Sequence, residues 1–200
     1  MKKYYLFGSK QSYTKVASAY APSGAKLAQE LIEDLENKYE LPFELNMVKL
    51  TIGKNSIEES DDLNGIETIW LDYLPNSFAW PLFSNRLKSI ISNHLTGQEN
   101  IDWISAKINT LSEQKEYYIP RFRDKLDVLD KENSTYIPDT DHIIKPCFSL
   151  FKISQYSIFH FPLDSNLWKI TSILYISDEL KKILQKEKIS GVCFDKANLA

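Results

Sequence analysis

Two short segments of this 200-residue chain share one pattern, and that pattern strongly constrains the fold. Residues 83–91 (FSNRLKSII) align without gaps with residues 176–184 (ISDELKKIL). In each segment an apolar residue ends an extended run and a serine follows, which suits a serine whose hydroxyl caps a short helix. Apolar residues then recur at helical spacing, and a glycine, Gly97 or Gly191, precedes a new apolar run. The sequence therefore predicts a strand, a serine-capped helix and a strand, used twice.

Duplication of one ancestral unit explains this repeat, and so does convergence of two segments on the same capping chemistry. A nine-residue match does not decide between the two. In both cases Ser84 and Ser177 are the predicted N-caps. The side chains that we expect these two helices to bury share i, i+3, i+4 spacing; they are Leu87, Ile90, Ile91, Leu180, Ile183 and Leu184.

The rest of the chain mixes strand patterns with one further helix. Leu27, Leu31, Leu35 and Tyr39 recur every four residues and predict a helix over residues 24–39, which Pro42 follows. Runs rich in β-branched and aromatic residues predict the strands. These are expected at residues 2–7, 43–52, 66–74, 147–153, 156–161 and 168–176, with residues 173–176 apolar on both faces and therefore central.

A further strand is predicted between Tyr118 and Val128, where apolar residues occupy the even positions. The polar odd positions predict one face in water, and Pro120 indicates an edge position or a bulge. Arg121 and Arg123 lie two apart on one face of this strand. That spacing suits a clasp for phosphate or carboxylate, but cross-strand pairing with an acidic side chain is the interpretation that we favour.

Length and composition favour one compact domain over residues 1–200. Apolar residues make up 43% of the chain, which is ample for a packed core. We predict an α+β fold with mainly antiparallel sheet and about three short-to-medium helices. The net charge of −3 argues against a globally basic nucleic-acid binder. The N-terminal apolar run, residues 4–7, is too short for a secretory signal and no run is long enough to span a bilayer, so we expect a cytoplasmic protein.

Candidate catalytic and metal-binding residues are few. No nucleophile, phosphate-binding or dinucleotide-binding motif is present. We interpret His142 as part of a polar turn, His94 as partly buried, and His160 as a structural residue that points away from its two Phe neighbours. We interpret Cys147 and Cys193 as free buried thiols, in preference to a disulfide or a metal site. We therefore predict no catalytic residue, no metal and no cofactor.

Two sets of residues are candidates for contact with a partner. Glu58, Glu59, Asp61 and Asp62 cluster in a polar loop predicted over residues 53–65. Such a cluster is either a solvated loop or an acidic patch that meets a basic partner, such as the active site of a nuclease. Aromatic side chains near Trp80 and Trp103 are candidate interface anchors.

The second half of the chain resembles bacterial polymorphic-toxin immunity proteins, specifically the immunity families numbered forty-three and eleven. The resemblance covers residues 80–194 best and depends on the order of four motifs. They are KYYL at 3–6, FSNRL at 83–87, LDVLDKENS at 126–134, and ISDEL at 176–180 with GVCF at 191–194. One departure stands out: Asn133 takes the place of the lysine expected before Ser134. Residues 8–79 match the family only in general character.

This resemblance implies a non-enzymatic cytoplasmic inhibitor that binds and neutralises a cognate toxin. Under it, the partner is a toxin protein, with neither nucleic acid nor membrane involved. The four carboxylates Glu58, Glu59, Asp61 and Asp62 then become the candidate contact site. Two alternatives stay open: an enzyme that acts on a small molecule, which needs a concave site with convergent polar groups, and a scaffold module within a larger assembly.

Overall fold

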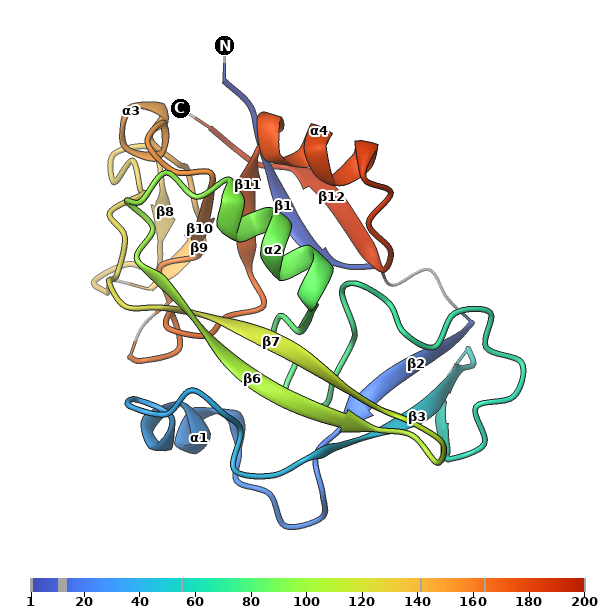
Figure 1. The fold of residues 1–200 in the computed structure, drawn as a ribbon. Coiled ribbons are helices and arrows are strands. Elements are labelled where there is room, and N and C mark those ends of the chain that lie inside the picture. The colour runs from blue at the N-terminus through green and yellow to red at the C-terminus, as the bar shows by residue number, and fades with distance from the viewer. Residues whose placement is uncertain (1, 11–13, 55, 141, 164, 200) are drawn as a thin grey trace.

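The computed structural model describes residues 2–10, 14–54, 56–140, 142–163 and 165–199. Within these ranges the chain forms three sheets, mostly antiparallel, and four short helices (Figure 1). The predicted α+β class is confirmed. The helices are α1 (Ala28–Asp34), α2 (Asn85–Asn93), α3 (Leu150–Ile153) and α4 (Asp178–Lys186).

A four-stranded antiparallel sheet gathers strands from both ends of the chain in the order β10, β11, β1, β12. They are β1 (Tyr4–Ser9), β10 (Ile158–His160), β11 (Leu174–Ser177) and β12 (Val192–Lys196). The N-terminal strand β1 is thus held between β11 and β12 from the C-terminal part of the chain. β11 lies between β10 and β1, which confirms the predicted central position of residues 173–176, although the strand begins only at residue 174.

A larger sheet of six strands contains the long hairpin of β6 and β7. Its strands are β2 (Lys15–Tyr20), β3 (Leu45–Ile52), β4 (Ile57–Ser60), β5 (Phe83–Ser84), β6 (Ile101–Asn109) and β7 (Gln114–Phe122). The main order is β2, β3, β6, β7, β5, with β4 paired to β3. β3 and β6 pair in parallel. A third, two-stranded sheet joins β8 (Thr135–Tyr136) to β9 (Ile143–Lys145).

Two apolar cores meet at the β6–β7 hairpin. On β7, Tyr117 and Ile119 belong to one core, and Phe122 belongs to the other. Since successive side chains of a strand point to opposite faces, these odd and even positions serve different sides of the sheet. The hairpin is therefore shared by both cores. The strand predicted between Tyr118 and Val128 ends at Phe122. Its expected water-facing side is wrong at Arg121, which is only 1% exposed, whereas Lys125 and Asp127 are exposed but lie beyond the strand.

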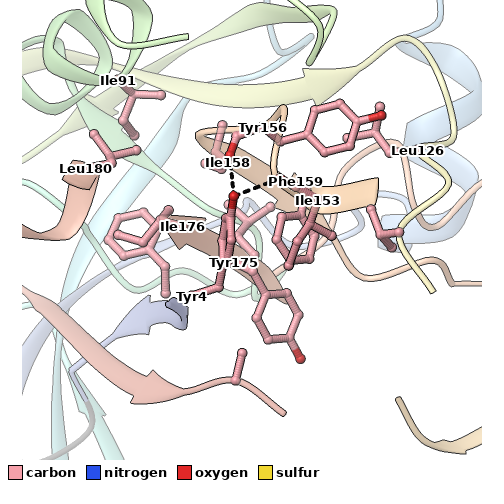
Figure 2. Close-up of a cluster of buried hydrophobic side chains, with 14 of the residues drawn as sticks. Tyr4, Ile91, Leu126, Ile153, Tyr156, Ile158, Phe159, Tyr175, Ile176 and Leu180 are labelled. Atoms are coloured by element: carbon pink, nitrogen blue, oxygen red, sulfur yellow. Dashed lines mark hydrogen bonds between the residues drawn. The ribbon is translucent and has the colours of Figure 1, made fainter. Parts of the chain in front are cut away.

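The core around the four-stranded sheet is rich in aromatic rings (Figure 2). Phe159 and Tyr175 stack with ring centroids 5.1 Å apart. The hydroxyl of Tyr4 donates hydrogen bonds to the backbone oxygens of Ile153, at 2.7 Å, and Tyr156, at 3.2 Å. One buried N-terminal side chain therefore fixes the end of α3 and the turn that follows it.

Both predicted serine caps are confirmed. The Ser84 hydroxyl accepts a hydrogen bond from the Leu87 amide, and the Ser177 hydroxyl accepts one from the Leu180 amide, each at 3.2 Å. Figure 2 places Ile91 of α2 and Leu180 of α4 near Ile176 of the sheet. The side chains that the two helices bury are Leu87, Ile91, Leu180 and Leu184, while Ile90 and Ile183 are half-buried.

The predicted helix over residues 24–39 is shorter in the structure, where α1 spans Ala28–Asp34. Leu31 and Leu35 are buried as expected, but Leu27 is 73% exposed and Tyr39 is 60% exposed. The apolar stripe therefore overestimates the helix at both ends. At the C-terminal end the backbone oxygens of residues 35, 36 and 38 turn toward the guanidinium of Arg121 instead of continuing the helix.

Two predicted strands are wrong. Residues 66–74 form irregular backbone that bonds to other loops. The amide of Tyr73 donates to the oxygen of the distant Ser190 at 3.1 Å, and the amide of Leu74 donates to the oxygen of Leu82 at 2.9 Å. The strand expected at residues 147–153 contains α3 instead. Tertiary contacts decide both segments, and apolar runs of this length do not distinguish a strand from a short helix.

Candidate partner-binding site

The acidic residues singled out from the sequence lie on and beside a β-hairpin. Residues 53–65 are not one polar loop, as predicted, because β4 pairs antiparallel with β3 from Ile52 opposite Ile57 to Lys49 opposite Ser60. Backbone pairing with β3 outweighs the polar character of these side chains. Glu58 and Glu59 therefore stand on a strand, and Asp61 and Asp62 follow in the turn after it.

All four carboxylates are exposed, but the hairpin does not present them on one face. Glu58 lies opposite Thr51 and Glu59 opposite Leu50, so their side chains point to opposite faces of β4. Asp62 has a distant ion pair with Lys49, 3.8 Å between Nζ and the carboxylate, and its other oxygen accepts the Asn64 amide at 3.0 Å.

Glu59 interacts with Tyr20 of β2, the strand that pairs with β3 on the side opposite β4. Burial, followed by the hydrogen bond to this carboxylate and its negative charge, raises the pKa of the Tyr20 hydroxyl. The Tyr20 hydroxyl therefore holds the Glu59 carboxylate on one face of the sheet. The Glu58 side chain points to the opposite face.

Two exposed isoleucines accompany these charges. Ile52 and Ile57 pair across β3 and β4, and they are 41% and 65% exposed. Apolar side chains surrounded by polar ones are typical of protein-binding surfaces. Neither isoleucine is among the residues predicted to contact a partner, although an isoleucine within the polar run SIEESDD is a usable signal.

The two arginines of β7 bind protein groups. Both arginines contact the carboxylate of Asp102, which lies opposite Arg121 in the β6–β7 register. Arg121 also donates to the backbone oxygens at the end of α1, and Arg123 donates to the oxygen of Glu36 at 2.7 Å. The favoured interpretation, cross-strand pairing with an acidic residue, is confirmed. These guanidiniums are already occupied, so they do not form a clasp for an external phosphate.

His160 is fully buried and is held on both ring nitrogens. Its Nε2 accepts the amide of Leu126 at 3.0 Å, and its Nδ1 lies 2.9 Å from the oxygen of Phe161. This arrangement fits a neutral ring with the proton on Nδ1. Burial is the largest influence and lowers the pKa of His160, against the opposing effect of nearby backbone oxygens. The structural role predicted for this residue agrees with these contacts.

The chain matches the family model described as Immunity protein family (Imm11) over residues 60–198. It belongs to this immunity protein family. No curated protein matches the chain. Imm11 is one of the two families that the motifs resemble, and the match begins earlier than the expected start at residue 80. It includes Asp61 and Asp62, whereas Glu58 and Glu59 precede it.

The remaining histidines and the two cysteines of this immunity protein are also candidate site residues. His94 is exposed at the end of α2, where Nδ1 lies 2.7 Å from the Ile90 oxygen, so the expected partial burial is wrong. His142 is exposed and follows a turn, as predicted. Cys147 and Cys193 are free and only half-buried.

The two tryptophans differ from the expectation that they anchor an interface. Trp80 is 4% exposed and stacks on Phe78, which removes it from the surface. Trp103 is half-buried and packs against Phe83. In the part of the chain that the structure describes, no three His, Cys, Asp or Glu side chains are arranged to hold a metal ion. No described helix has the length and apolar character needed to cross a membrane.

Proposed function

We propose that this protein neutralises a cognate bacterial toxin by binding it directly, as a non-enzymatic inhibitor in the cytoplasm of the cell that it protects. Membership of the Imm11 immunity family over residues 60–198 is the observation that carries the proposal. Inhibition of this kind needs a stable surface that covers a functional part of the toxin, and the apolar core that includes Leu45 and Met47 of β3 supports such a surface.

The β3–β4 hairpin is the surface that we propose for the first contact. Its carboxylates are exposed and its two isoleucines offer apolar area. Negative charge attracts a basic toxin surface over several ångströms in solution, and apolar contact then slows dissociation. Because Glu58 and Glu59 point to opposite faces, a partner that uses both carboxylates must contact the outer edge of β4.

The test of neutralisation is growth. An adjoining gene that encodes a secreted protein with a variable C-terminal domain is the toxin gene to test, and it is expressed alone and together with this protein. Co-expression is expected to restore growth, and the purified proteins are expected to form a complex of defined stoichiometry. Absence of both rescue and complex formation would refute the proposed function.

Charge reversal tests the hairpin. Changing Glu58, Glu59, Asp61 and Asp62 to Lys is expected to slow association about tenfold at low salt and to reduce its salt dependence. A control with the same net charge changes four exposed carboxylates elsewhere: Glu33, Glu132, Glu179 and Asp195. If rescue holds and both variants associate alike, the hairpin is only a solvated surface. Glu58→Lys and Glu59→Lys, made separately, show which face of β4 the toxin approaches.

A further inference from the structure

A groove of about 960 Å³ lies beside the small β8–β9 sheet. One wall consists of residues 125–129, which contribute five consecutive residues to the lining, and the other wall includes residues 136–140. Five extended residues are roughly 16 Å long. The groove is therefore long enough for a short strand, and both walls belong to the part of the chain that matches the immunity family.

The wall at residues 125–128 has the alternation of a β-strand. Leu126 and Val128 are 7% and 1% exposed and face the core, as Figure 2 shows for Leu126, whereas Lys125 and Asp127 are exposed. The amide of Leu126 donates to His160, and the oxygen of Val128 accepts the amide of Ser149 at 3.1 Å. The backbone groups of Leu126 and Val128 therefore point to one side, into the protein.

In an extended chain the backbone groups of alternate residues point to opposite sides. Those of Lys125 and Asp127 consequently point away from His160 and Ser149, on the side of the groove. Among the described residues, neither the amide nor the carbonyl of Lys125 or Asp127 has a hydrogen-bond partner. Residues 125–128 belong to no strand of the structure, but the unpaired backbone groups of Lys125 and Asp127 can pair with another extended chain as those of a strand edge do.

Charge and apolar area along the groove indicate what kind of chain fits. The charged residues that line the groove are two lysines, Lys125 and Lys131, and two aspartates, Asp127 and Asp139, so their formal charges balance. Asp127 already binds Lys152, whose Nζ lies 2.9 Å from its carboxylate. Lys125 and Lys131 have no ion-pair partner among the described residues, so they are the cations that can meet an acidic side chain. Ile137, 45% exposed, adds apolar area to the opposite wall.

We propose that this groove binds an extended segment of the toxin, which adds as a β-strand to residues 125–128 and presents apolar and acidic side chains. The inference rests on the proposed function and concerns a surface separate from the acidic hairpin. Backbone hydrogen bonds to Lys125 and Asp127 align the segment. The lysines at the rim, Lys125 and Lys131, bind its acidic side chains.

A proline at position 127 tests the backbone contact. Asp127→Pro removes an amide that the free protein does not use, and an extended position tolerates the ring. Asp127→Ala is the matched control, because both variants lose the ion pair with Lys152 but only the proline loses the amide. Affinity for the toxin encoded by the adjoining gene is expected to fall about tenfold more in Asp127→Pro than in Asp127→Ala. Thermal unfolding of both variants verifies that they fold.

Amide exchange and charge reversal provide independent readouts. The amide protons of Lys125 and Asp127 are expected to exchange rapidly in the free protein and slowly in the complex. The double variant Lys125→Glu/Lys131→Glu is expected to weaken binding about tenfold. The control Lys145→Glu/Lys186→Glu changes two exposed lysines that do not line the groove and is expected to bind normally.

The outcomes separate this inference from the proposed function. If the wild-type protein does not bind the toxin, the proposed function fails and the groove proposal fails with it. If the wild-type protein binds but Asp127→Pro equals Asp127→Ala and both amides stay rapidly exchanging, only the groove proposal is overturned. Weaker binding by the proline variant together with protection of the two amides supports strand addition.

Discussion

Arg121 and Asp102 face each other across β7 and β6, and the guanidinium binds the carboxylate at two points, 2.7 Å from Nε and 2.8 Å from a terminal nitrogen. The same guanidinium donates to the backbone oxygens that end α1. A single buried side chain therefore joins the β6–β7 hairpin to the helix. Its charge is stabilised because every nitrogen of the guanidinium has an acceptor.

Loss of this arginine is expected to destabilise the fold strongly. Arg121→Ala leaves Asp102 without one partner and the end of α1 without its donors, which we expect to cost about 3 kcal/mol or more. Arg123→Ala is the control, since that side chain also binds Asp102 but is 25% exposed, and a cost of about 1 kcal/mol is expected. Urea unfolding measures both. Equal costs would contradict the anchoring role of Arg121.

The stability costs of removing the two serine caps can be compared with each other. Ser177→Ala is expected to cost about 1 kcal/mol. Ser84→Ala is expected to cost up to about 2 kcal/mol, because the Ser84 hydroxyl also donates to Asp72 at 2.7 Å. Ser89, whose hydroxyl bonds within its own helix, is the control, and Ser89→Ala should be close to neutral. Chemical denaturation that ranks Ser177→Ala below Ser84→Ala in stability would contradict this account.

These caps were predictable because the signal is local. A serine followed by helical apolar spacing specifies the N-terminus of a helix within four residues, and both predictions hold. The central position of residues 173–176 is a similar case, because an uninterrupted apolar run has to be covered on both faces.

The burial of Arg121 could not be predicted in the same way. Its neighbours in sequence alternate as in a strand with one wet face, but Asp102 and the end of α1 come from elsewhere in the chain. The strand that carries Glu58 and Glu59 likewise depends on pairing with β3. The groove is a third case, since its free edge exists only because Leu126 and Val128 bond inward to His160 and Ser149.

Stability is expected to fall as the pH drops below about 6.5. The folded state lowers the pKa of His160, so between the lowered value and the ordinary one the unfolded chain binds more protons. The contribution of the neutral ring is therefore complete above about pH 6.5 and is lost on acidification. Urea midpoints at pH 7.5 and 5.5 measure the effect, and NMR of the ring protons follows the titration directly. A His160 ring that titrates near its ordinary pKa would contradict the assignment.

We propose that residues 1–200 unfold as one domain even though the described residues form two apolar cores. Both cores include residues of β7, so unfolding of one core displaces a strand against which the other core packs. Tryptophan fluorescence and far-ultraviolet circular dichroism are expected to give coincident transitions in urea. Ile119→Ala in one core and Leu180→Ala in the other should shift the whole transition. Two separated transitions would show that the cores are independent.

Figure 1 shows β3 at the lower right and β8 and β9 at the upper left, so the hairpin that contains β3 and the groove lined by residues of β8 and β9 are well separated. Substitutions that share no neighbours usually have additive effects on free energy. The combined variant with Asp127→Pro and the four hairpin lysines is therefore expected to lose affinity by the product of the two separate losses. Surface plasmon resonance at several salt concentrations measures this, and only the hairpin component should change strongly with salt. A combined loss no larger than the greater single loss would mean that the toxin contacts just one of these surfaces.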